Sequence, residues 1–207
     1  MNIGLVLECT KDGADSKVLP HFIKMMNEQY ELRIQLAPPA TLGNFPKLKE
    51  SCGTAAKAHF ESGCDRVVIV WDLDSRGAHG NPDRGLDNDV TYIKNQLRSA
   101  GIDLSKVDLI GIHRELESWL IADGRAIAAV ISKMTGRPAR GVRRANDPEA
   151  QVDPKSWLSR TFREHKAREY RDFQHAEMLA KGHPDFREIR ACETFTRFVL
   201  KISGQTI

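Results

Sequence analysis

Short apolar runs recur along this chain, and helix-length segments separate them. Three runs predict strands: NIGLVLE (2–8), RVVIVWD (66–72) and KVDLIGIH (106–113). The first is nearly continuous, as expected for a strand buried on both faces. A fourth, YELRIQLAP (30–38), alternates and then meets prolines. Because parallel strands need long crossover connections, the pattern predicts an α/β, Rossmann-like three-layer fold. Its sheet is expected to have four mainly parallel strands with right-handed crossovers.

The segments between the strands have the apolar spacing of helices, and they cover 16–29, 45–62 and 87–100. After residue 115 the pattern is helical, apart from a link rich in proline and arginine at 136–154. The final segment, 155–207, predicts two or three helices. We therefore expect an α/β domain over residues 1–135, followed over 136–207 by a basic linker and a helical extension that packs on it.

The composition predicts a globular protein of the reducing cytoplasm. Of the 207 residues, 41% are hydrophobic and 29% are charged, which is ordinary for a chain that buries a core. No apolar run reaches the roughly 18–20 residues that span a bilayer, and the N-terminus does not resemble a signal peptide. None of the four cysteines forms a C-x-x-C pair, which argues against a zinc knuckle and favours free thiols.

Carboxylates follow three of the four predicted strands, at Glu8, Asp72, Asp74, Glu115 and Glu117. The carboxyl ends of parallel strands meet at one edge of a sheet, where such folds bind ligands. Like charges gathered there repel one another unless a cation lies among them. Carboxylate oxygens are the ligands that magnesium prefers. The pattern therefore predicts a site for Mg²⁺ or Mn²⁺ at this edge.

Each acid also has a simpler explanation when it is taken alone. An Asp-x-Asp after a strand is more often a turn or a helix cap than a metal site. Glu8 can favour the N-terminus of the next helix through its charge. Glu117 can open a helix whose Trp119 and Leu120 lie in the core. Only the combination of these acids at one sheet edge favours a functional site.

The glutamate that closes the first strand, the Asp-x-Asp that closes the third and the α/β order together resemble the Toprim domain. That domain occurs in topoisomerases, bacterial primases, recombination proteins and OLD-type nucleases. ESWLIAD (117–123) resembles the Glu-x-Trp-Leu-x-Ala-Asp stretch of an uncharacterised bacterial Toprim-like family. ETFTRFVL (193–200) is similar to the late Ser/Thr-x-x-Phe helix of the same family.

The first loop departs from this family. The family places a glycine after the strand-ending glutamate, then a Ser/Thr and an acidic residue. Here the sequence is ECTKDGADSKVL (8–19), with Cys9 at the glycine position and Thr10 at the hydroxyl position. The loop is longer, and the sequence leaves open whether Asp12 or Asp15 fills the acidic position.

The resemblance implies a metal-dependent nuclease with catalytic Glu8, Asp72 and Asp74. Asp72 and Asp74 would hold Mg²⁺ or Mn²⁺, Glu8 would complete the site or act as general acid/base, and Glu117 would bind a second ion. A topoisomerase needs a further domain with a tyrosine nucleophile, and a primase usually carries a zinc module, so a nuclease fits best. The competing hypothesis is a non-catalytic module that binds nucleic acid or nucleotides.

The expected partners follow from charge and from the resemblance. Arginines and lysines are frequent over 137–171, as on surfaces that contact phosphates, although a solvated helical face with ion pairs explains them equally well. The predicted nucleic-acid contacts are Lys17, Arg76, Arg140, Arg143 and Arg144, with DNA favoured over RNA. The chain has no Walker motif, so a separate ATPase partner, in a bacterial defence or mobile-element system, is expected from the resemblance alone. The oligomeric state stays open.

Overall fold

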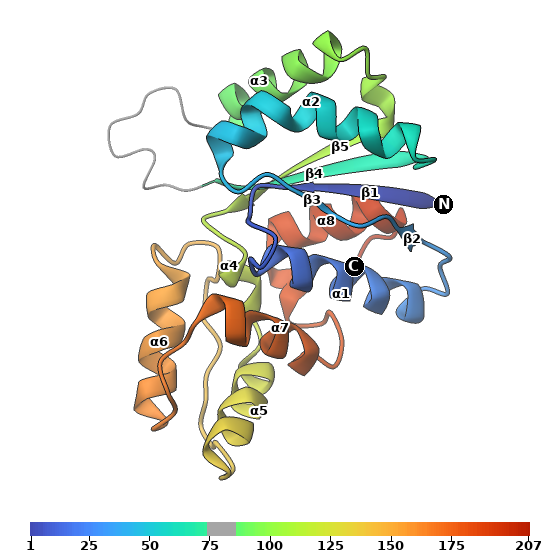
Figure 1. Ribbon diagram of the computed structural model, residues 1–207. Coiled ribbons are helices and arrows are strands. Elements are labelled where there is room, and N and C mark those ends of the chain that lie inside the picture. The colour runs from blue at the N-terminus through green and yellow to red at the C-terminus, as the bar shows by residue number, and fades with distance from the viewer. Residues whose placement is uncertain (74–85) are drawn as a thin grey trace.

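The computed structural model describes residues 1–73 and 86–207 and confirms the predicted α/β fold class (Figure 1). All strand pairs are parallel, and the sheet runs in the order β2-β1-β4-β5, with β3 also paired to β1. The strands are β1 (Asn2–Leu7), β2 (Gln35–Leu36), β3 (Ala40–Thr41), β4 (Arg66–Leu73) and β5 (Val107–His113). The two longest, β4 and β5, lie side by side, so their carboxyl ends reach the same edge.

The sheet differs from the prediction at its β1 edge. In place of one strand over 30–38, two short strands pair with β1 in succession, with Asn2 opposite Gln35 and Val6 opposite Ala40. Pro38 and Pro39 lie between them. Proline has no backbone N–H and cannot donate to a strand ladder, so the pairing is interrupted there. Within residues 1–73 and 86–207 the sheet therefore has five strands, and β2 and β3 share the position beside β1.

Helices cover both faces of the sheet, which explains why the strand sequences are almost continuously apolar (Figure 1). One face carries α2 (Phe45–Glu61) and α3 (Leu86–Ser99), and the other carries α1 (Asp15–Gln29) and α8 (Glu193–Ser203). Successive residues of β4 alternate between the two buried clusters: Val67 and Ile69 pack toward α2 and α3, and Val68 and Val70 pack toward α1.

A 3-10 turn, η1 (Leu104–Lys106), lies just before β5. The chain after residue 115 has the expected helices and a second 3-10 turn, η2 (Ile189–Ala191). Its helices are α4 (Glu117–Leu120), α5 (Gly124–Thr135), α6 (Pro154–Glu164), α7 (Asp172–Gly182) and α8. One hydrophobic cluster extends from β1 and α1 through α5, α6 and α7 to α8. This core includes residues on both sides of position 135, so the boundary between the α/β domain and the helical extension stays a prediction. Within the described residues, no helix combines the length and apolar character that crossing a membrane requires.

The two segments that carry the family resemblance meet in this core. The Trp119 side chain is buried, and its Nε1–H donates to Thr194 Oγ1 over 2.8 Å. The Phe195 ring packs against the indole at a centroid distance of 5.1 Å. Glu149 completes the arrangement by accepting the backbone N–H groups of Glu193 (2.6 Å) and Thr194 (3.0 Å). Glu149, in the 136–153 link, thus caps the N-terminus of α8.

Replacing Glu149 by alanine is expected to lower the free energy of unfolding by about 1–2 kcal/mol, the usual cost of losing a helix cap. Urea denaturation followed by circular dichroism measures the change. Glu169→Ala is the matched control, because Glu169 is exposed, and we expect its effect to stay within about 0.5 kcal/mol. Equal stabilities of the two variants would show that the cap contributes little.

Candidate functional site

Two predicted site residues meet where β1 and β4 end. Glu8 follows β1 directly, and its backbone N–H donates to the Val70 carbonyl over 3.2 Å, which continues the strand pairing. The Glu8 Oε2 accepts the backbone N–H of Asp72 over 3.0 Å. The parallel register therefore places both carboxylates at the carboxyl edge of the sheet, as the sequence predicts.

Asp15 adds a third carboxylate, and it is the acid of the first loop that faces the site. Asp15 begins α1 and is buried, whereas Asp12 is exposed. After burial itself, the charge of Asp15 is the largest cause that raises the pKa of Asp72. The preceding loop is tight: a Cβ at Gly13 would lie 2.8 Å from the Cys9 Cβ. This close turn carries the chain from β1 to α1 and brings Asp15 back over the strand end.

Two more carboxylates follow the end of β5. Between β5 and α4, Arg114 has a φ of 68°, in the left-handed region that costs a residue other than glycine about 1–2 kcal/mol. The Ser118 Oγ–H donates to the His113 carbonyl over 2.9 Å. The turn leaves Glu115 and Glu117 buried, with Glu117 only 1% exposed.

Lys155, from α6, lies among these acids. Its Nζ is 2.9 Å from Glu115 Oε2, 3.7 Å from Glu117 Oε2 and 3.8 Å from Asp172 Oδ2. Tyr170 donates its hydroxyl hydrogen to Glu117 Oε1 over 3.0 Å. We call this group the acidic cluster, and its members are Glu8, Asp15, Asp72, Glu115, Glu117 and Asp172, with Lys155 and Tyr170. Lys155 was expected only among the basic residues of 137–171 that could contact phosphates, and no place at this sheet edge was predicted for Lys155, Tyr170 or Asp172.

Burial and mutual repulsion raise the pKa values of the acids. Burial first, and the charges of Asp15, Glu8 and Glu117 next, raise the pKa of Asp72 well above its usual range. Burial raises the pKa of Glu117 to about 8, with Glu115 adding to the shift and Lys155 opposing it. Burial raises the pKa of Asp15 to about 6, again against the pull of Lys155. One ammonium therefore does not neutralise the cluster.

The shift at Glu117 predicts how stability depends on pH. A carboxyl whose pKa is raised in the folded state stabilises the fold at pH values below its pKa in the unfolded chain, 4.5 for Glu117. This contribution is lost as pH rises through about 8, the pKa of Glu117 in the folded state. Glu117→Gln keeps the acceptor for Tyr170 and removes the titration. We expect the variant to match the native protein at pH 5 and to exceed its unfolding free energy by on the order of 2 kcal/mol at pH 8.5.

Urea titrations at a series of pH values provide the measurement. Glu28→Gln is the control, because Glu28 forms only an exposed pair with Lys24 at 3.8 Å. As a surface substitution, it should change the free energy of unfolding by no more than about 0.5 kcal/mol. If the stability difference between Glu117→Gln and the native protein does not grow from pH 5 to pH 8.5, this would contradict a strongly raised pKa at Glu117.

The predicted nucleic-acid contacts are dispersed. Arg76 and Asp74 lie outside the described residues. Lys17 is half-buried, and its Nζ donates to the Phe173 carbonyl over 3.4 Å, one residue from Asp172 of the cluster. Arg140 and Arg143 are exposed, and Arg144 forms an ion pair with Glu188 at 2.6 Å. Their contact with nucleic acid stays a prediction.

The acidic cluster fits a divalent cation in its donor chemistry. Hard carboxylate oxygens are what Mg²⁺ and Mn²⁺ prefer. Burial first, and neighbouring carboxylates next, raise the pKa values of Asp72 and Glu117, and a bound divalent cation would favour their charged forms. Residues 1–73 and 86–207 contain no group of three acidic, histidine or cysteine side chains already arranged to hold a metal. The predicted ligand Asp74 lies outside these ranges.

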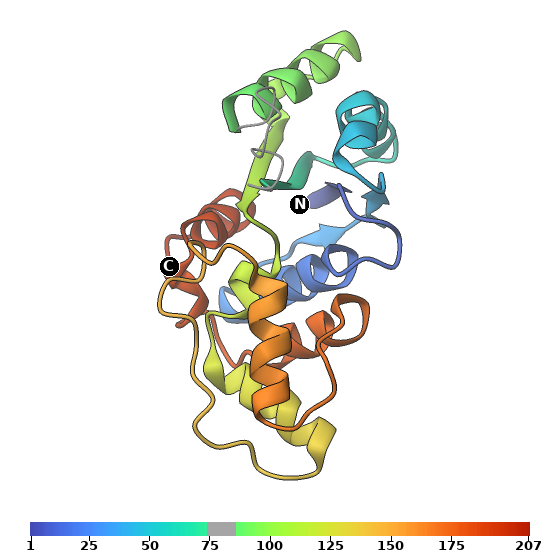
Figure 2. The same ribbon diagram turned by 90° about the vertical axis from the view of Figure 1, so that its left-hand side faces the viewer.

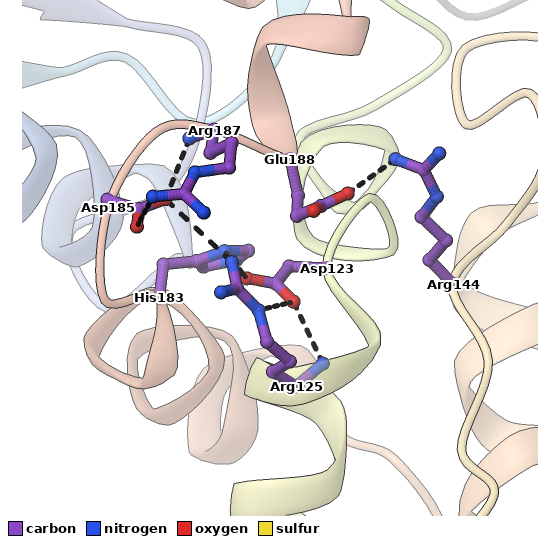
Figure 3. A network of polar contacts seen from close by, with 7 residues as sticks. All are labelled: Asp123, Arg125, Arg144, His183, Asp185, Arg187 and Glu188. Atoms are coloured by element: carbon purple, nitrogen blue, oxygen red, sulfur yellow. Dashed lines mark hydrogen bonds and ion pairs between the residues drawn. The ribbon is translucent and has the colours of Figure 1, made fainter.

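The last acid of ESWLIAD belongs to a different network (Figure 3). Asp123 caps α5 and accepts hydrogen bonds from the Arg125 backbone and guanidinium. The buried His183 Nδ1 lies 3.6 Å from Asp123 Oδ2. Burial would raise the pKa of Asp123, but His183 and Arg125 outweigh it and lower the pKa. This network ties α5 to the end of α7, apart from the acidic cluster.

Comparison with known proteins gives no relative: no family model matches the chain, and neither does any curated protein or solved structure. The Toprim resemblance therefore rests on the motifs and on the strand order alone.

Proposed function

We propose that this protein is a metal-dependent nuclease that hydrolyses phosphodiester bonds in nucleic acid, DNA rather than RNA, in the cytoplasm. The observation that carries the proposal is the acidic cluster: carboxylates at the ends of β4 and β5 and in the first turn of α1 gather at one sheet edge, and burial raises the pKa values of Asp72, Glu117 and Asp15. Glu8, at the end of β1, accepts a hydrogen bond from the Asp72 backbone there. Perturbed acids at the ligand-binding edge of an α/β sheet are typical of functional sites. The motifs that resemble OLD-type nucleases support a separate ATPase partner.

The residues divide into three roles under this proposal. Asp72, Asp74 and Glu8 would hold the Mg²⁺ or Mn²⁺, and Glu117 would serve a second ion. The ion, when bound, polarises the phosphate and lowers the pKa of attacking water. Alternatively, Glu8 would not bind the ion but would accept or return a proton at its carboxylate as general acid/base. Lys155 offers an ammonium to the negative charge that develops on the phosphate.

One observation favours a second candidate, a non-catalytic module that binds nucleic acid or nucleotides. The Lys155 ammonium already forms ion pairs with Glu115, Glu117 and Asp172. Such pairing can hold a buried acidic network together without a metal, as in a structural ion-pair network. In that case the acids would stabilise the carboxyl edge of the sheet, and the protein would not cleave nucleic acid.

Incubation with plasmid and single-stranded DNA, with Mg²⁺, Mn²⁺ or EDTA, separates the two candidates. The nuclease proposal expects cleavage with either metal and none with EDTA. It also expects Mn²⁺ to raise the melting temperature, because an ion that binds the folded state stabilises it. A protein that is neither stabilised by Mn²⁺ nor active, even with its ATPase partner added, would leave the binding module as the better explanation.

A further inference from the structure

A pocket on the outer side of α6 is not part of the acidic cluster. It has a volume of about 710 Å³, within the range of about 300–1,000 Å³ that is typical of ligand pockets. Its walls come from the end of the 136–153 link and from one side of α6. Among the residues that line it are Val152, Asp153, Trp157, Arg160, Arg163 and Glu164. Figure 2 shows α6 at the front of the molecule, with the link passing beside it.

Trp157 gives the pocket an accessible aromatic ring. The aromatic side chains of the basic region are Trp157, Phe162 and Tyr170, and the last two are buried in the core. Trp157 is half-buried, lines the pocket and lies two residues from Lys155 on the same helix. Exposed Val152 extends the apolar wall. An indole that is held on one side and open on the other is a platform on which a planar base can stack.

Two guanidiniums border the same pocket. Arg160 and Arg163 are exposed, and neither forms an ion pair with the described part of the chain, whereas Arg66, Arg144 and Arg197 each pair with a carboxylate. Acidic groups are present as well. Asp153 accepts hydrogen bonds from the Ser156 backbone and hydroxyl, both at 2.8 Å, and caps α6. Glu164, in the last turn, is exposed.

We propose that this pocket binds one unstacked nucleotide of a single-stranded nucleic acid, with its base on Trp157 and its phosphates against Arg160 and Arg163. The inference rests on the proposed nuclease function, because it gives that site a flanking subsite. The two sites share α6: Lys155 faces the acidic cluster and Trp157 faces the pocket. A duplex keeps its bases stacked and does not offer one to the ring.

The test uses a labelled 12-nucleotide oligo(dT) and the full chain in EDTA, so that binding is measured without cleavage. Stacking contributes about 1–3 kcal/mol per base. We therefore expect Trp157→Ala to weaken binding about 10-fold, since 1.4 kcal/mol is tenfold in affinity. Arg160→Gln with Arg163→Gln should also reduce the salt dependence, by about 0.7 in slope for each phosphate that is no longer neutralised. Arg98→Gln removes one positive charge on α3, outside the pocket, and should change neither quantity.

Intrinsic fluorescence gives a second measurement in the unaltered protein. Trp71 and Trp119 are 1% and 0% exposed, so quenching by added oligo(dT) reports on Trp157. Saturable quenching by the oligonucleotide, weaker with a duplex and much weaker with dTMP, is the expected result. Equal affinity for dTMP, or an unchanged affinity in Trp157→Ala, would overturn the proposal. The binding assay contains no metal, so its result does not depend on cleavage. If binding depends on Trp157 but the protein does not cleave DNA with Mg²⁺ or Mn²⁺, the nuclease function is refuted and the nucleotide subsite is still supported.

Discussion

Asp72→Asn is expected to lower metal-dependent cleavage about 100-fold or more, the largest effect that we expect from any single substitution in the chain. The exchange keeps the size of the side chain and its backbone, and so the hydrogen bond from the Asp72 N–H to Glu8 Oε2. It removes one anionic oxygen from the predicted ligand set, and even residues that only support metal ligands cost 10–100-fold when they are changed. Cleavage of plasmid DNA under single-turnover conditions with Mg²⁺ measures the loss.

Asp12→Asn is the matched control for this substitution. Asp12 lies in the same loop as Asp15 but is exposed and outside the acidic cluster. It should retain cleavage within about twofold, as expected of a surface position. Asp72→Asn should also abolish the rise in melting temperature with Mn²⁺, whereas Asp12→Asn should keep it. Full activity in Asp72→Asn would remove Asp72 from the catalytic residues.

The positions of β1, β4 and β5 were predictable because these strands are mostly apolar along their length. Both faces of β1, β4 and β5 are covered, so most of the residues that alternate between the two cores are apolar. Asp108, which is buried in β5, forms an ion pair with Arg66 of β4. The edge beside β1 was less predictable. An alternating run suggested one strand, but Pro38 and Pro39 divide the pairing with β1 into two short ladders.

The acidic cluster was predictable only where strand ends define it. Glu8 and Asp72 follow from the register of neighbouring parallel strands, and Glu117 from the end of β5. Asp12 and Asp15 could not be ranked, because the choice depends on where α1 begins. Lys155 could not be placed either. It lies 40 residues beyond Glu115, within a basic stretch where nothing in the sequence separates an inward lysine from exposed arginines.

Lys155→Met is expected to lower the free energy of unfolding by about 2–3 kcal/mol at pH 8. Removing one partner from a buried ion pair typically costs 3–5 kcal/mol, and this figure is reduced here because the Lys155 side chain is 41% exposed. Methionine keeps most of the aliphatic length, so the loss reports mainly on the charge. At pH 5 the effect should be smaller, because Glu117, with a pKa of about 8, and Asp15, with a pKa of about 6, are then protonated.

Lys181→Met is the matched control, since Lys181 forms an exposed ion pair with Glu177 at 2.6 Å. Such surface pairs contribute about 0–1 kcal/mol. Equal losses in the two variants at pH 8 would mean that the ion pairs of Lys155 with the acidic cluster contribute no more to stability than an exposed surface pair.

The same variant also separates the two candidate functions. Without the ammonium, the acidic cluster has a larger excess of negative charge, and a divalent cation that binds there replaces the lost neutralisation. Under the nuclease proposal, Mn²⁺ should therefore stabilise Lys155→Met more than it stabilises the native protein, and EDTA should reverse the gain. If the acids form only an ion-pair network around Lys155, Mn²⁺ should not recover the stability that Lys155→Met loses.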